Sequence, residues 1–253
     1  MTTIVLHPAL VFGISFVGLW IAAVAGAYLH KGNSFSEGMR HEFGIILAAT
    51  LTLLGLLIGF SFSMAGNRYD QRKNLEAVEA NAIGTAFLRA DLLGAGDAGK
   101  LRDLLKKYAE VRVRFYVANE HDVREVDMQT VQLQKELWSA VQTPAIQQQG
   151  ALASLAVSGM NDVINAQRHI QAAWWNRIPI AAWVFMALIA VGCNMLVGYG
   201  LRTFKPRSPL LIILPILVAL AFLLIDDIDT PRLGLIKVVP RNLISLLDSL
   251  NTP

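Results

Sequence analysis

Four stretches of the chain are apolar, carry no charge and are long enough to cross a bilayer. They are residues 8–29, 43–66, 178–201 and 208–225. About 20 apolar residues are needed for a helix to span the hydrocarbon core of a membrane. The pattern therefore predicts an all-α protein with four transmembrane helices. Helices 1 and 2 lie within residues 8–66, and helices 3 and 4 lie within residues 178–225.

The polar side chains gather between the second and third spans. Residues 67–177 carry apolar positions at steps of three and four, which is typical of amphipathic helices. We expect the second and third spans to extend out of the bilayer as stems, with a polar helical bundle built on them. Residues 226–253 are expected to dock on this bundle. Arg112 and Arg114 are expected on a solvated or interhelical face of it.

Composition supports a membrane protein and narrows the classes of partner. The chain is 54% hydrophobic and 16% charged, whereas soluble domains carry about 25% charged residues. The net charge of +3 comes without a dense basic tract, so a nucleic acid is not expected as a partner. No catalytic or cofactor-binding motif is found, and we do not expect an enzyme. The lipid bilayer is the expected environment.

The second span has two adjacent helical stripes. One is small and hydroxylated, and the other is apolar: Thr52, Gly55, Gly59, Ser63 and Gly66 against Leu54, Ile58, Phe62 and Ala65. In one interpretation Gly55, Gly59 and Gly66 let another helix approach closely, as small residues do in lipid. In the other, the span lines an axial pore, with Leu54, Ile58 and Phe62 as a constriction that gates by dewetting. The two interpretations are compatible if the second span contacts a neighbouring helix on one side and lines a pore on another.

The fourth span ends in a cluster of three carboxylates, Asp226, Asp227 and Asp229. Negative charge at a helix C-terminus opposes the helix dipole, so the cluster calls for a partner. It can be a polar stop to the span with Arg232, Arg68 or Arg72 as counter-ion. It can be a Ca²⁺ site, although Ca²⁺ needs six to eight oxygens and backbone carbonyls would have to complete the shell. It can also be a cation or proton path at the mouth of a pore.

Two segments carry a resemblance to a known family. They are "LLIGFSFSMAGNRYDQRKNLEAVEANAIG" in the second span and its stem, and "DDIDTPRLGLIKV" after the fourth span. Both resemble the bestrophin-like bacterial membrane proteins, which are more distantly similar to the bestrophins, a family of pentameric anion channels. The paired tryptophans of the bestrophins are replaced here by "YDQRKN". The resemblance implies a homo-oligomer, such as a pentamer, with the second spans around a shared axis. It also favours Ca²⁺ at the aspartates.

Two functions follow as hypotheses. The first is a homo-oligomeric ion channel or pore for inorganic ions. The second is a non-conducting membrane scaffold or stress sensor whose helical bundle recruits partners. Four spans place both termini and the bundle on one side of the membrane. Basic residues near the span ends number eight on that side and five on the other, which favours a cytoplasmic bundle in the bacterial inner membrane.

Overall fold

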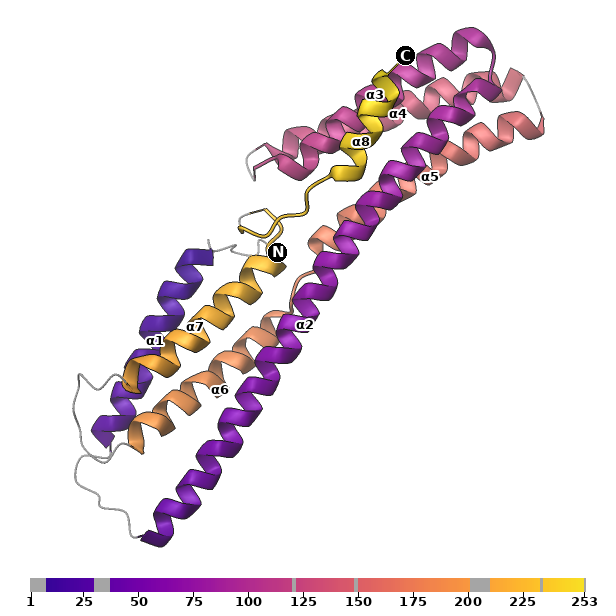
Figure 1. Ribbon diagram of the computed structural model, residues 1–253. Coiled ribbons are helices and arrows are strands. Elements are labelled where there is room, and N and C mark those ends of the chain that lie inside the picture. Colours follow the sequence, from indigo (N-terminus) through magenta and orange to yellow (C-terminus); the bar gives the residue numbers. More distant parts are fainter. Residues whose placement is uncertain are drawn as a thin grey trace. The chain divides into compact units, whose positions relative to one another are not determined.

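The computed structural model describes residues 8–29, 37–119, 122–147, 150–200, 210–232 and 234–252, and these are almost entirely helical (Figure 1). The elements are α1 (Pro8–Leu29), α2 (Glu37–Arg89), the short 3-10 helix η1 (Ala90–Leu92), α3 (Ala95–Val117), α4 (Val123–Gln147), α5 (Ala151–Trp175), α6 (Ile180–Tyr199), α7 (Leu210–Asp229) and α8 (Arg241–Asn251). No strand occurs among the described residues. Four helical stretches are long and apolar enough to cross a membrane. The predicted all-α, four-span class is confirmed.

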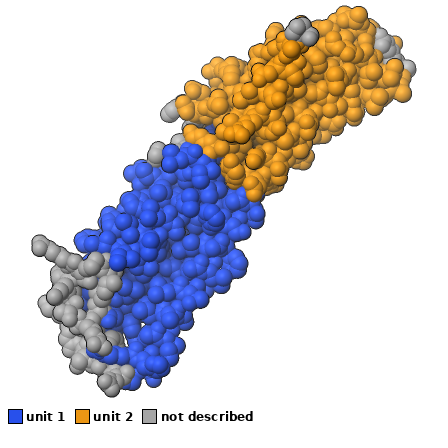
Figure 2. Space-filling model, viewed as in Figure 1, with its two compact units in different colours: residues 1–67, 177–236 blue, residues 68–176, 237–253 orange. Residues whose placement is uncertain are grey.

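The chain forms two compact units, coloured separately in Figure 2. Unit 1 comprises residues 1–67 and 177–236, and unit 2 comprises residues 68–176 and 237–253. Helix α2 contributes to both, because it runs unbroken for 53 residues, about 80 Å at the usual helical rise. The predicted C-terminal segment 226–253 is divided between the units: residues 226–236 belong to unit 1, and only the remainder, with α8, belongs to the bundle.

In unit 1, helix α1 packs along both α6 and α7. A Cβ atom placed on Gly26 would overlap the carbonyl oxygen of Met195, and one placed on Gly198 would overlap that of Ala23. These two glycines let the backbones of α1 and α6 come into contact, as small residues commonly do between membrane helices. The close helix crossing inside the protomer therefore lies at α1 and α6, away from the glycines of the second span.

Helix α7 passes through Pro215 without ending. Proline has no N–H, so the carbonyl of Leu211 loses its helical donor. Leu211 is fully buried against Ala23 and Ala27 of α1. The disturbed turn is thereby covered by a neighbouring helix, as the absence of water in lipid demands.

Unit 2 is a helical bundle built on the last part of α2. Its apolar core draws on every helix of the unit and includes Ile83, Leu101, Phe115, Leu137, Ile170 and Leu243. Helix α5 supplies the stem of the third span, but four non-helical residues, 176–179, separate it from α6. Pro179 explains the break, since the residue before a proline is disfavoured in the helical region.

Candidate functional site

One face of α2 packs into the interior of unit 1. Leu54, Ser61 and Ala65 are buried there, and Leu54 and Ile58 pack against apolar residues of α6 and α7. These α2 positions follow one another at steps of three and four, which keeps them on one side of a helix. The apolar stripe predicted from the sequence is thus largely the face that α2 turns toward its own protomer.

The three residues predicted as a constriction are placed differently from one another. Leu54 is 2% exposed in the core of unit 1, and Ile58 is partly buried beside it. Phe62 lies at the edge of this face and is 45% exposed. Of the three, only Phe62 is exposed.

The small stripe of α2 lies on the exposed side of the helix. Thr52, Gly55, Gly59 and Ser63 are exposed, and Gly66 is half-buried. A Cβ atom added to any of the three glycines would meet no atom of the described residues within 4 Å. Close packing at these glycines is therefore not found inside the protomer, and it stays a prediction about contacts between copies.

Several large side chains share this exposed side with the small stripe, and the two most exposed are Leu56 and Phe60. Leu56 is 52% exposed and Phe60 is 62% exposed. Together with Thr52 they are spaced by four residues, so they line up along the helix. Sequence reasoning missed Leu56 and Phe60 because every position of the span is apolar or small. Only the packing of α6 and α7 shows which apolar residues are left outside.

Two buried polar side chains of the spans form hydrogen bonds, although the Asn194 Oδ1 has no partner among the described residues. The Ser61 hydroxyl donates to the sulfur of Met186, 2.9 Å away. The Asn194 amide donates to the carbonyl of Ala190 at 2.8 Å. Polar groups in lipid are commonly satisfied in this way, by neighbouring helices or by their own backbone.

The aspartates at the end of α7 hold the backbone of unit 1. Asp227 accepts hydrogen bonds from the N–H groups of Leu235 and Ile236 at 2.7 and 2.9 Å. Gly234 lies against this carboxylate so closely that a Cβ atom there would be 2.6 Å from the Asp227 Oδ1. Asp229 accepts from the N–H of Ile178 at 2.9 Å, just before α6. Two of the three carboxylates therefore fasten chain segments to the end of α7.

Asp226 is the remaining member of the cluster. It is half-buried, and the charge of Arg177 lies close enough to act on it. Arg72 donates to backbone carbonyls of unit 2, and its role as a counter-ion of the cluster stays a prediction. Ca²⁺ at this cluster stays a prediction without geometric support: no three acidic, His or Cys side chains among the described residues are grouped to hold a metal ion.

In unit 2, the inward face of α2 carries three buried charged residues. Arg72, Glu76 and Glu79 are each no more than 1% exposed. Arg72 donates from Nε to the carbonyl of Ala173 at 3.2 Å and from a terminal nitrogen to that of Asn176 at 3.1 Å. The last carbonyls of a helix lack intrahelical donors, so Arg72 caps the C-terminal end of α5.

Glu76 performs the matching role at the N-terminal end of α8. Its Oε1 accepts from the N–H of Leu243 at 2.9 Å, and its Oε2 accepts from the side chain of Asn242 at 2.5 Å. A carboxylate at a helix N-terminus satisfies free N–H groups and complements the helix dipole. The predicted docking segment is thus held at its first turn by a charge on α2.

Glu79 forms a fully buried ion pair with Arg112. Arg112 Nε lies 2.5 Å from Glu79 Oε1, and the guanidinium carbon lies 4.3 Å from the centre of the Phe115 ring. Burial opposes the charge of Arg112, but Glu79 outweighs it and raises the pKa of Arg112. Burial, followed by the charge of Glu79, raises the pKa of Tyr116. The phenol therefore stays protonated and donates to Glu79 Oε2 at 3.3 Å.

Two alternatives were open for Arg112, a solvated face and an interhelical face, and the structure places it on an interhelical face. Arg112 is completely buried between α3 and α2. Arg114, two residues further, is on the exposed side and bonds to Gln129 of α4. The spacing of Arg72, Glu76 and Glu79 continues into the apolar Ile83, and that periodicity is the signal that could have placed the charges inside.

Comparisons with known proteins give a family and a fold. The Bestrophin-like domain family model matches residues 11–243. The chain is similar in fold to a bacterial bestrophin homologue from Klebsiella pneumoniae, solved as a point mutant. The TM-score is 0.61 at 13% identity, over 97% of this chain and 98% of that one. A second structure of that homologue, solved by zinc phasing, gives 0.59 at 13% identity, over 95% and 98%. No curated protein matches the sequence.

Proposed function

The chain belongs to the bestrophin-like family, and we propose that it forms a homo-oligomeric ion channel with α2 helices lining a shared axis. The observation that carries this proposal is the face of α2 that its own protomer leaves uncovered. A Cβ atom added to Gly55 or Gly59 would meet nothing within 4 Å outside the adjoining helix backbone, among the described residues. Each glycine costs a helix roughly 1 kcal/mol relative to alanine, and membrane helices use such residues to approach one another.

Polar side chains on the same face support an axial position. Thr52 and Ser63 are exposed within the second span. The hydroxyl of Thr52 is satisfied by the carbonyl of Ala48 at 2.9 Å, so lipid could tolerate it. The face combines missing side-chain volume with two exposed hydroxyl side chains, whereas the exposed side of α1 has a glycine, Gly18, but no exposed serine or threonine. The large exposed side chains around Gly18 include Leu10, Ile14, Val17 and Ile21.

We place the constriction at Leu56 and Phe60, with Phe62 at the edge. Rings of apolar side chains can close a pore by dewetting it. Leu56 and Phe60 project from the uncovered side of α2. Leu54 and Ile58 face the interior of unit 1 and are not part of the proposed constriction. Thr52 and Ser63 would provide wettable positions on either side of it.

The location and the stoichiometry are proposed from the family resemblance and the charge pattern. The protein is placed in the bacterial inner membrane, with its termini and the helical bundle on the cytoplasmic side. A pentamer is the subunit number that the likeness to bestrophins implies. Ion selectivity is left out of the proposal, because the uncovered part of α2 within the second span carries no charged side chain.

The experiment is an ion-flux assay on protein reconstituted in liposomes. Leu56→Ala and Phe60→Ala should increase flux several-fold, because each widens an apolar ring. Ile14→Ala, on the exposed face of α1, is the matched control and should leave flux unchanged. Cross-linking in detergent gives the subunit number beforehand.

The possible results separate the two functions. A monomer in detergent and in liposomes would end the channel proposal. An oligomer in which wild type and both α2 variants remain silent would favour the scaffold or sensor function. An Ile14→Ala effect equal to that of Phe60→Ala would show that the assay reports membrane leakage.

A further inference from the structure

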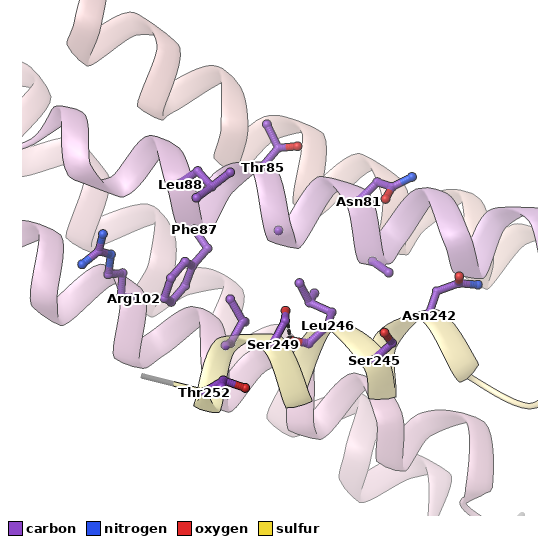
Figure 3. Close-up of a pocket in the computed structure, with 13 residues that line it drawn as sticks. Asn81, Thr85, Phe87, Leu88, Arg102, Asn242, Ser245, Leu246, Ser249 and Thr252 are labelled. Carbon is purple, nitrogen blue, oxygen red and sulfur yellow. Dashed lines mark hydrogen bonds between the residues drawn. The ribbon is translucent and has the colours of Figure 1, made fainter.

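A groove of about 740 Å³ lies between α2, α3 and α8, entirely within unit 2 (Figure 3). Sites for small organic ligands commonly have volumes of about 300–1,000 Å³. Helix α8 is seated while the groove is open, because a Cβ atom on Gly84 would already lie 3.1 Å from the side chain of Leu246. The groove is therefore a feature of the assembled bundle and does not result from a detached C-terminal helix.

Both long walls of the groove present hydrogen-bonding groups that the protein does not use. Asn81 and Thr85 lie one turn apart on α2, and Ser245 lies on α8 (Figure 3). Among the described residues, none of these three side chains forms a hydrogen bond or an ion pair. An amide and hydroxyls together can donate to a ligand and accept from it. A ligand lying in the groove could bridge the two helices.

One end of the groove is positively charged and aromatic. Arg102 is the only charged residue among those that line the groove. Its guanidinium lies 5.2 Å from the centre of the Phe87 ring, and the ammonium of Lys106 lies 6.0 Å from the same ring. Asp91 pairs with one terminal nitrogen of Arg102. The Arg102 Nε is buried and has no hydrogen-bond partner among the described residues.

The positions of Arg102 and Phe87 favour one chemical class of ligand. The planar guanidinium of arginine matches the geometry of carboxylate and phosphate groups, and the Arg102 side chain is 37% exposed beside the groove. An aromatic ring beside it offers apolar contact to a flat group. We propose that the groove binds a small organic anion. Its oxyanion group pairs with Arg102, its flat apolar part lies against Phe87, and its polar groups reach Asn81, Thr85 and Ser245.

Phenyl phosphate is the simplest probe, since it joins one oxyanion group to one flat ring. Binding is measured by titration calorimetry on the purified full-length protein in detergent, with inorganic phosphate and phenol as half-ligands. We expect phenyl phosphate to bind at least 10-fold more tightly than either half. Equal binding of inorganic phosphate and phenyl phosphate would overturn the proposal, because it would reduce the site to an adventitious anion contact.

Two variants locate the binding. Arg102→Gln should weaken phenyl phosphate at least 10-fold, whereas Arg114→Gln, on the same helix but outside the groove, should leave it unchanged. Thr85→Trp fills the groove from an exposed position and should abolish binding. Circular dichroism verifies that each variant is folded. No heat with wild type, equal binding to Arg102→Gln, or retained binding to Thr85→Trp would each refute the site.

Discussion

Helix α2 keeps an inward face at three- and four-residue steps in both units, but the chemistry of that face changes at the unit boundary. In unit 1 the inward residues are apolar or small, with Leu54, Ser61 and Ala65 buried. In unit 2 the next inward residues are Arg72, Glu76 and Glu79, equally buried. The same geometry therefore serves two different kinds of core.

The difference follows from the partners that each unit offers. In unit 2 the ends of α5 and α8 leave backbone groups that a charged side chain can satisfy, and α3 brings Arg112 to Glu79. In unit 1 the neighbours of Leu54 are apolar side chains. A charge there would have no partner and would cost several kcal/mol. Burial of a charge in this protein thus depends on what lies opposite it.

The largest expected effect on stability distinguishes the glycines at the contact of α1 and α6 from the glycines of the second span. Gly198→Leu should destabilise the protein by more than about 4 kcal/mol, because the new side chain must displace the backbone of α1. Gly59→Leu should change protomer stability by less than about 1 kcal/mol, since nothing in the protomer opposes it. Unfolding by SDS titration measures both. If Gly59→Leu also prevents folding, α2 has a partner within the protomer that we have not assigned.

The buried ion pair of unit 2 comes next. Arg112→Met should cost about 3–5 kcal/mol, because it leaves the Glu79 carboxylate buried without its cation. The double variant Glu79→Leu with Arg112→Met should recover at least half of that loss. Arg114→Met is the exposed control and should lie within about 0.5 kcal/mol of wild type. A double variant no more stable than the single one would mean that the pair is needed for more than neutralising charge.

A smaller loss of stability is expected for substitutions in the aspartate cluster of unit 1, where two of its members can be compared. Asp227→Ala should cost about 1.5–3 kcal/mol, because two buried backbone N–H groups lose a charged acceptor. Asp226→Ala should cost clearly less, because the Asp226 Oδ2 is buried without a hydrogen-bond partner among the described residues, and the hydrogen bond of this carboxyl group is made to the Thr230 side chain and not to backbone N–H groups. Thermal unfolding in detergent compares the two. The reverse order would assign the structural role to Asp226.

The attachment of α8 is expected to be the weakest of these effects. Glu76→Ala removes the carboxylate that caps the first turn of α8, and lost caps cost about 1 kcal/mol. Hydrogen exchange of residues 241–251 should accelerate about 5-fold while exchange in α3 stays unchanged. Unchanged exchange in α8 would show that its apolar contacts alone hold it.

Calcium calorimetry tests the remaining prediction for the aspartates. Because Asp227 and Asp229 already accept backbone hydrogen bonds, we expect no more than weak binding. Any heat that wild type does show should be absent in Asp226→Asn and Asp229→Asn. Tight binding by wild type that both variants abolish would restore the cluster as a metal site.

The predictability of the candidate site differs between residues. Thr52, Gly55, Gly59 and Ser63 could be grouped from the sequence, because small and hydroxylated residues stand out in a leucine-rich span. Leu56 and Phe60 could not be separated from Leu54, because all three are large and apolar in a segment whose surroundings are apolar on every side. Hydropathy carries no direction in such a helix, so packing alone assigns its inner face.

The sequence by itself determined the helical class, the four spans and the long stem of α2, because hydrocarbon thickness and backbone hydrogen bonding leave few other structures for such runs. The tertiary structure decided where the charges belong. Arg72, Glu76 and Asp227 bind backbone groups 8 to 167 residues away in the chain. Those partners come together only when the helices pack, and no local pattern contains them.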